Sequence, residues 1–254
     1  MGSADFICRD RAVSVCAVIP AAGRGSRLGT DGPKILAPLT ERDTIWSILH
    51  AKLAPLVDHI HLVLSPDGAE GFPPLPPNVS RSIQPVPLGM GDAIFGASAV
   101  WTRFDAVLIV WGDQVFISAD TLRRALKALS STTRHAVLPV TRMQQPYVEY
   151  LFEGTKLVKV LQTREGDHTT PNGFSDVGTF LLGTAGLTEA WDRYLAQAPR
   201  GSASGEINFL PFLPFLSAQD WTMTALEVAD ATEARGINTK EDLLFFQNLY
   251  RKTP

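Results

Sequence analysis

Pro20-Ala21-Ala22-Gly23-Arg24-Gly25-Ser26-Arg27 is the stretch that decides the fold, because it follows an apolar run over residues 12–19 that predicts a buried strand. A glycine-rich loop at the end of such a strand leaves backbone N–H groups unpaired. Those groups can bind phosphate oxygens or the edge of a base. The sequence therefore predicts a nucleotide site at the carboxyl end of this strand.

The residues in and near this loop suit a nucleotide. Gly23 and Gly25 can adopt backbone conformations closed to other residues and let a ligand come close. Ala21 and Ala22 leave room for a flat ring. Positive charge, which forms strong charge-assisted bonds with phosphates, comes from three residues: Arg24, Arg27 and Lys34.

Two common phosphate-binding motifs do not match this loop. A dinucleotide fingerprint requires Gly-x-Gly-x-x-Gly, but Gly23, Gly25 and Gly29 leave one residue too many before the third glycine. A Walker A loop requires Gly-Lys-Ser/Thr, whereas Lys34 follows Pro33. A tight turn with scattered basic residues would explain a lone Gly-x-Gly, so the assignment depends on motifs elsewhere in the chain.

Outward from the loop, the first half of the chain alternates apolar runs with helical patterns. This alternation predicts a parallel sheet covered by helices on both faces. Residues 65–79, rich in proline and glycine, predict a loop. The other predicted elements are strands at 59–64, 81–85, 106–111 and 136–140 and helices at 44–56, 91–101 and 118–129.

The pattern changes after residue 141. Two apolar runs on either side of Glu153-Gly154-Thr155 predict a β-hairpin, followed by a polar loop over residues 163–175. The remaining predicted elements are strands at 177–182 and 223–228 and helices at 187–198, 206–217 and 241–250.

We therefore expect one α/β domain with a Rossmann-like mixed, mostly parallel sheet flanked by helices and a smaller β-rich lobe. In this division, residues 12–141 form a nucleotide-binding lobe and residues 142–235 an acceptor-binding lobe. Residues 236–254 return to the nucleotide lobe and end in a helix.

Composition narrows the partners and the compartment. The 254 residues are 45% hydrophobic and carry a net charge of −3, which favours a globular chain without the basic face that nucleic acids or anionic membranes require. The two cysteines, Cys8 and Cys16, are too few for a disulfide framework. The first residues lack the pattern of a signal peptide, so we expect a cytoplasmic protein.

The order of its motifs makes the chain resemble the sugar-1-phosphate nucleotidyltransferases, in particular the uridyltransferase domain of N-acetylglucosamine-1-phosphate uridyltransferase. That family has Ala-Ala-Gly-x-Gly-x-Arg, a short spacer and Pro-Lys, which correspond here to residues 21–27 and to Pro33-Lys34. The resemblance implies the nucleotide-diphospho-sugar transferase fold. It also implies that residues 20–26 bind the nucleotide and that Arg27 and Lys34 act on its phosphates as catalytic residues.

A second matching segment resembles the part of the family that reads a pyrimidine. Gln84 precedes Gly89-Met90 by the same spacing, and its amide offers both a donor and an acceptor to a uracil or cytosine edge. The resemblance implies that Gln84, Gly89 and Met90 contact the nucleotide. Taken alone, Gln84 could equally be a polar residue at a strand end.

Two further motifs predict a magnesium site. Trp111-Gly112-Asp113 ends an apolar strand, and Gly236-Ile237-Asn238 precedes the last helix. The resemblance implies that Trp111 and Gly112 lie beside the nucleotide and that Asp113 and Asn238 bind Mg²⁺, a hard ion that prefers oxygen ligands. Without the resemblance, Asp113 could cap a turn and Asn238 could cap the following helix.

The predicted acceptor wall departs from the family pattern. Gln162 stands where the uridyltransferase has glutamate, Asp176 where it has asparagine, and Val148 where it has glycine. Met90 replaces a threonine beside the nucleotide. A carboxylate only accepts hydrogen bonds, whereas an amide also donates them, so these exchanges alter which acceptor hydroxyls can be bound.

These observations predict a Mg²⁺-dependent nucleotidyltransferase that joins a nucleoside triphosphate, UTP in the first instance, to a sugar 1-phosphate and releases pyrophosphate. Its partners would be that triphosphate and a phosphorylated small molecule. Two alternatives remain open: a cytidylyltransferase acting on a non-sugar, polyol-type phosphate, and a non-catalytic nucleotide-binding regulator. The paired oxygens of Asp113 and Asn238 disfavour the regulator.

Overall fold

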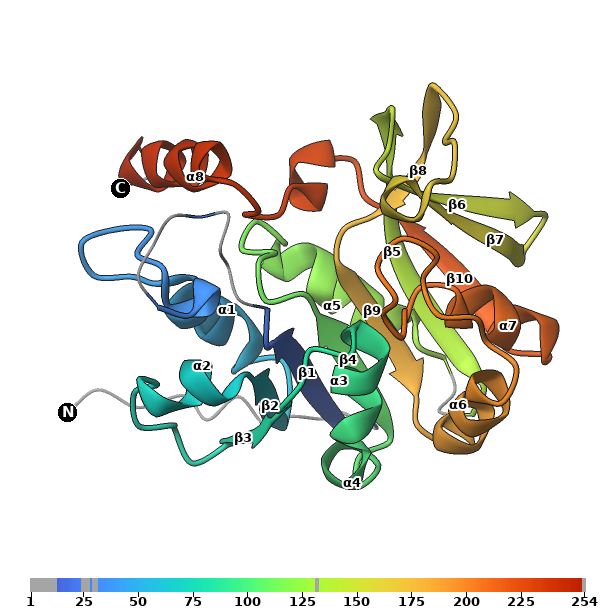
Figure 1. The fold of residues 1–254 in the computed structure, drawn as a ribbon, viewed down its shortest axis with the longest axis horizontal. Coiled ribbons are helices and arrows are strands. Elements are labelled where there is room, and N and C mark those ends of the chain that lie inside the picture. Colours follow the sequence, from blue (N-terminus) through green and yellow to red (C-terminus); the bar gives the residue numbers. More distant parts are fainter. Residues whose placement is uncertain (1–12, 24–27, 29–31, 131–132, 253–254) are drawn as a thin grey trace.

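The fold is given by a computed structural model, which describes residues 13–23, 28, 32–130 and 133–252 (Figure 1). A mixed sheet runs through the molecule, and helices cover both of its faces. The predicted fold class is confirmed. The strands on either side of the predicted division at residues 141 and 235 belong to one sheet, so the structure does not separate the two lobes. The division stays a prediction.

Ten strands of the described chain form this sheet in the order β3-β2-β1-β4-β9-β5-β8-β6-β7, with β10 paired to β5. The pairings of β1 with β2 and β4, of β2 with β3 and of β5 with β10 are parallel, and the rest are antiparallel. Only β7, β8 and β9 therefore run against the other strands. The strands are β1 Val15–Ala21, β2 His59–Leu64, β3 Val79–Ile83, β4 Ala106–Val110, β5 His135–Gln144, β6 Val148–Glu153, β7 Lys156–Gln162, β8 Asn172–Asp176, β9 Thr179–Gly183 and β10 Thr222–Glu227.

The central strands are apolar on both faces because both faces are covered. In β1, Val15, Ala17 and Ile19 pack into one core, while Cys16 and Val18 pack into the core on the opposite face. All five side chains are at most 1% exposed. A parallel strand buried on both faces reads as an unbroken apolar run, which is why this strand is recognisable in the sequence.

Helices occupy both faces of the sheet (Figure 1). One core contains residues of α1, α5 and α8, and the other contains residues of α3, α4, α6 and α7. The described helices are α1 Ile45–Leu53, α2 Pro66–Glu70, α3 Met90–Gly96, α4 Ser98–Trp101, α5 Ala119–Ala128, α6 Leu187–Leu195, α7 Phe212–Ala218 and α8 Lys240–Lys252, with single 3₁₀ turns η2 Lys34–Leu36, η3 Thr163–Glu165 and η4 Ala231–Ala234. No helix within these described ranges is long and apolar enough to cross a membrane.

Three predicted elements were wrong. Residues 65–79 contain the short helix α2, which Ser65 caps by accepting a hydrogen bond from the Gly68 N–H. The predicted loop 163–175 contains η3 and most of β8, whose polar residues pair with the outer end of β5. The helix predicted at 206–217 begins only at Phe212, because the preceding residues are extended along the cavity described below.

Candidate functional site

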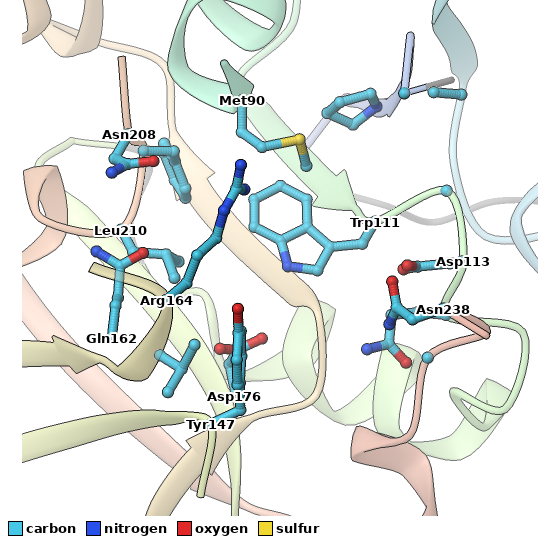
Figure 2. Close-up of a pocket in the computed structure, with 18 of the residues that line it drawn as sticks. Met90, Trp111, Asp113, Tyr147, Gln162, Arg164, Asp176, Asn208, Leu210 and Asn238 are labelled. Carbon is cyan, nitrogen blue, oxygen red and sulfur yellow. The ribbon is translucent and has the colours of Figure 1, made fainter. Parts of the chain in front are cut away.

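A cavity of about 810 Å³ opens where the carboxyl ends of β1 and β4 face the antiparallel part of the sheet. Its nucleotide-side wall consists of the ends of these parallel strands with η2, Met90 and residues 234–238. Its acceptor-side wall consists of the start of β6, the end of β7, η3, the end of β8 and residues 206–210. Figure 2 shows side chains from both walls directed into the same space. Ligands of open α/β sheets bind at this end of the strands.

The ends of β1 and β4 lie close together on the nucleotide-side wall. Pro20, Ala21 and Gly23 line the cavity from the first strand, and Trp111-Gly112-Asp113 lines it from the second. A Cβ atom on Gly112 would lie 3.1 Å from the Pro20 carbonyl oxygen and 3.2 Å from the Ala21 Cβ. The glycine therefore permits the two strand ends to approach, which leaves their backbone groups facing the cavity.

Lys34 connects the two predicted metal ligands. Its Nζ lies 2.6 Å from Asp113 Oδ2 and 3.1 Å from Asn238 Oδ1. Asn238 reaches this point because the Ile237 N–H donates to the Asp113 carbonyl oxygen at 3.1 Å. One cation thus holds two oxygen ligands that are 125 positions apart in the chain.

The side chain of Asn238 does not cap the helix that follows it, which was the alternative interpretation. Its Oδ1 accepts from Lys34, while Thr239 and Asp242 cap the start of α8. Asp242 Oδ2 also accepts from the Asn238 N–H at 3.1 Å, which fixes the backbone of the residue and leaves its amide directed at the cavity.

The same oxygens suit a divalent metal ion. Asp113 and Asn238 supply one carboxylate and one amide oxygen, and both already surround a positive charge. A Cβ on Gly236 would lie 3.2 Å from both Asp113 Oδ1 and Asn238 Nδ2, so this glycine keeps space open between the two side chains. Hard oxygen donors with open space for phosphate and water are what Mg²⁺ requires.

Other predicted nucleotide residues lie apart from this wall. Met90 lines the cavity, but Ala22, Gln84 and Gly89 are not among its lining residues. The Gln84 side-chain amide donates to the Gly89 carbonyl at 3.2 Å and to Asp92 Oδ2 at 2.7 Å, and the residue is 8% exposed. Its role as a base reader stays a prediction. The predicted residues Arg24, Gly25, Ser26 and Arg27 lie outside the described residues.

The predicted acceptor residues Val148, Gln162 and Asp176 all line the opposite wall. Asp176 is 8% exposed, and it accepts hydrogen bonds from the Tyr150 hydroxyl at 3.1 Å and from the Gly178 N–H at 2.7 Å. Burial raises the pKa of Asp176 despite these two donors. The carboxyl group is thus held by two hydrogen bonds on the acceptor-side wall.

Sequence reasoning missed a set of residues on the acceptor-side wall. The most prominent is Arg164, which in Figure 2 extends into the cavity towards Met90 and Trp111. Its guanidinium binds Glu206, with Nη2 2.6 Å from Oε1. The other missed residues of this wall are Tyr147, Ser175, Glu206, Asn208, Phe209 and Leu210, and those of the nucleotide-side wall are Ile35, Gln114, Ala234 and Gly236.

A signal for part of this set was present in the sequence. The helix predicted at 206–217 contains Pro211 at its sixth position, and proline is disfavoured in a helix interior. The structure places Pro211 at the N-cap position of α7, so the residues before it were free to line a site.

Comparisons with known proteins identify similar sequences and similar folds. A family model described as a MobA-like NTP transferase domain matches residues 17–176. The bifunctional protein GlmU from two strains of Acidithiobacillus ferrooxidans is 26% identical over 239 residues, which cover 92% of this chain and 51% of the relative. The chain thus spans about half the length of these curated relatives.

Among the solved structures with a similar fold are two enzymes from bacteria. A protein assigned as a glucose-1-phosphate thymidylyltransferase from Bacillus anthracis matches with a TM-score of 0.70 and 16% identity, covering 95% of this chain and 97% of its own. A 4-diphosphocytidyl-2C-methyl-D-erythritol synthase from Anaerococcus prevotii matches with a TM-score of 0.64 and 15% identity, covering 94% and 96%.

Proposed function

The chain belongs to the family of MobA-like NTP transferase domains, which are nucleotidyltransferases, and we propose that it joins UTP to a sugar 1-phosphate with release of pyrophosphate. The predicted family relationship is confirmed. One observation carries the proposal. Lys34, Asp113 and Asn238 converge at the cavity between a wall of strand ends and a wall that carries the predicted acceptor residues.

In the proposed reaction, an oxygen of the acceptor phosphate attacks the α-phosphorus of the triphosphate. A new oxygen–phosphorus bond forms, and the bond from the α-phosphorus to the bridging oxygen of the β-phosphate breaks. Pyrophosphate leaves with that oxygen. The acceptor phosphate is already an anion, so no general base is required, and catalysis depends on positioning and charge stabilisation.

The described residues would divide this work between the two walls. Asp113 and Asn238 would hold Mg²⁺, which when bound offsets the repulsion between the phosphates of the two substrates. Lys34, released from these two oxygens, would bind the α-phosphate or the leaving phosphates, together with Arg27. Gln162 and Asp176 would bind acceptor hydroxyls from the opposite side.

A cytidylyltransferase acting on a polyol-type phosphate is the second candidate. The departures at Gln162 and Asp176 favour it, because they change the hydrogen-bonding wall that the sugar-1-phosphate enzymes present to their acceptor. A regulator that only binds nucleotide is disfavoured by the convergence of Lys34, Asp113 and Asn238, which binding alone does not require.

A two-stage screen tests the proposal. The four ribonucleoside triphosphates and thymidine triphosphate are first compared for thermal stabilisation of the protein with Mg²⁺, and we expect the largest shift with UTP. UTP and CTP are then each combined with a panel of sugar 1-phosphates and polyol phosphates, and pyrophosphate release is measured. Stabilisation by none of the triphosphates would refute the proposal, and turnover of CTP with a polyol phosphate would establish the second candidate.

A further inference from the structure

Residues 201–208, here called the bridging segment, connect the two walls of the cavity. The segment is compact, because the Gly201 N–H donates to the Glu206 carbonyl at 2.9 Å and the Gly205 N–H donates to the Gly201 carbonyl at 2.8 Å. Two of its residues, Glu206 and Asn208, line the cavity. Its partners on either side belong to different parts of the predicted active site.

On the nucleotide side, the bridging segment pairs with the start of α3. The Ile207 N–H donates to the Leu88 carbonyl at 2.7 Å, and the Gly91 N–H donates to the Ile207 carbonyl at 2.9 Å. The first N–H groups of a helix lack partners within the helix, so the Ile207 carbonyl satisfies one of them. Met90, which lines the cavity, lies between these two hydrogen bonds.

Gly89 explains how the two backbones come so close. Its φ of +119° is a conformation that favours glycine, and a Cβ there would lie 2.7 Å from the Ile207 carbonyl oxygen and 2.8 Å from the Ile207 nitrogen. The resemblance implies that Gly89 contacts the nucleotide. In the structure, the absence of a side chain at Gly89 also leaves the space that the backbone of the bridging segment occupies.

On the acceptor side, Glu165 holds the bridging segment. Glu165 Oε1 accepts from Ser204 Oγ at 2.6 Å and from Asn208 Nδ2 at 3.1 Å, and Oε2 accepts from the Ala203 N–H at 2.9 Å. The Ser204 hydroxyl, with the other donors, lowers the pKa of Glu165 to about 2. Glu165 does not itself line the cavity.

The ion pair of Arg164 with Glu206 adds a second connection on the acceptor side, and both of its members line the cavity. A ligand that engages Arg164 or Asn208 therefore restrains the bridging segment. Because the same segment holds the backbone on both sides of Met90, that restraint reaches the nucleotide side without any contact between the two ligands.

We infer that the bridging segment is a positioning element that couples nucleotide affinity to the state of the acceptor-side wall, an inference that rests on the proposed function. Glu165 acts through Ser204 and Asn208, and Ile207 acts through its backbone on the start of α3. Coupling of this kind is reciprocal, so nucleotide binding also orders the bridging segment.

Glu165→Gln tests the inference without altering a cavity-lining residue. The substitution replaces one acceptor oxygen of the carboxylate by an NH₂ group, which only donates hydrogen bonds. That NH₂ group would face either the side-chain donors or the backbone N–H groups that now donate to the carboxylate. Asp167→Asn is the matched control in the same turn. Asp167 Oδ2 accepts only from the Gln162 N–H among the described contacts, and an asparagine oxygen can take its place.

The first measurement is hydrogen–deuterium exchange in the protein without ligands. We expect Glu165→Gln to speed exchange of the Gly91 and Ile207 amides at least about fivefold, while Asp167→Asn leaves both unchanged. Unchanged exchange at Gly91 in Glu165→Gln would overturn the inference, whatever nucleotide the protein binds. Thermal melting of both variants checks that they are folded.

The second measurement uses UTP with Mg²⁺ and no acceptor. In the wild type, UTP should slow exchange of amides 203–208, and in Glu165→Gln it should bind at least about fivefold more weakly. UTP binding with unchanged exchange in that segment would overturn the inference. If the wild type binds none of the five triphosphates, the proposed function fails. The ligand-free exchange of the Gly91 amide in Glu165→Gln still decides, independently, whether the bridging segment positions α3.

Discussion

The two walls of the cavity are built in different ways. The nucleotide-side wall uses the ends of β1 and β4, and its glycines expose backbone groups to a ligand. The acceptor-side wall uses side chains from antiparallel strands and from the extended residues before α7. Backbone recognition suits a group that every substrate shares, whereas side-chain recognition can be changed one residue at a time.

The walls also differ in how their charges are satisfied. On the nucleotide-side wall, one cation, Lys34, meets the side-chain oxygens of Asp113 and Asn238. In the proposed reaction, these groups would exchange each other for phosphates and a metal ion. On the acceptor-side wall, Arg164 already pairs with Glu206, and Asp176 is buried with two donors. We expect the first wall to serve the chemistry and the second to select the acceptor, and three predictions test that contrast.

The largest effect is expected on the nucleotide-side wall. Asp113→Asn or Lys34→Met should lower pyrophosphate release by on the order of 10²–10³-fold, because each removes a preorganised charge at the reacting phosphates. Steady-state turnover with UTP and the best acceptor measures this loss. Asp120→Asn, an exposed carboxylate in the first turn of α5, is the control and should leave turnover unchanged. Near-normal turnover in Asp113→Asn would remove the nucleotide-side wall from the chemistry.

The contrast between the walls also explains what the sequence predicts well. The β1 loop, Asp113 and Lys34 could be found because their motifs are contiguous and follow apolar strands. Asn238 could be placed only by resemblance, since 125 positions separate it from Asp113. Backbone pairing of Ile237 with Asp113 joins the two, and no local pattern encodes that pairing.

The acceptor-side wall was harder to predict for a physical reason. Strand β8 carries Asn172, Gly173 and Ser175, whose polar character predicts a loop, yet its pairing with β5 satisfies the backbone and makes it a strand. Arg164 was visible only as part of a polar loop. Its ion pair depends on Glu206, 42 positions later, which the fold brings beside it.

The second prediction concerns selection. Gln162→Glu combined with Asp176→Asn restores the side chains of the resembling uridyltransferase, so the ratio of kcat/KM for N-acetylglucosamine 1-phosphate to that for the preferred acceptor should rise by about 10–100-fold. The KM for UTP should stay unchanged, because neither residue lies on the nucleotide-side wall and neither forms a described hydrogen bond with the bridging segment. Kinetics with both acceptors measure the ratio.

Each single variant serves as a control for this exchange. In Asp176→Asn, the amide oxygen of the new side chain can still accept from the Gly178 N–H, and the Tyr150 hydroxyl can turn to accept from the amide N–H, so we expect the protein to remain folded. A change in the UTP KM as large as the change in acceptor preference would contradict the separation of the two walls.

The smallest expected effect is on the free energy of unfolding. It comes from two buried histidines, His61 in β2 and His135 in β5, in the parts of the sheet that support the two walls. His61 in β2 bonds Ser80 Oγ at 2.7 Å and Ser82 Oγ at 2.9 Å, and burial, with nearby His59, lowers the pKa of His61 to about 4. His135 in β5 bonds Thr224 Oγ1 at 2.9 Å, and burial lowers its pKa as well.

Because the pKa of His61 is lower in the folded state than its ordinary value of 6.5, the unfolded chain binds more protons between pH 6.5 and pH 4. The stability that neutral His61 contributes is therefore complete above pH 6.5 and is lost as the pH falls towards 4. Between pH 7.5 and pH 5.5 the loss from this residue is at most about 1.4 kcal/mol.

His61→Gln should remove that part of the pH dependence, measured as the free energy of unfolding in urea at both pH values. His135→Gln tests the acceptor side in the same way, and an equal flattening by His61→Gln and His135→Gln would show that acid weakens the supports of both walls alike.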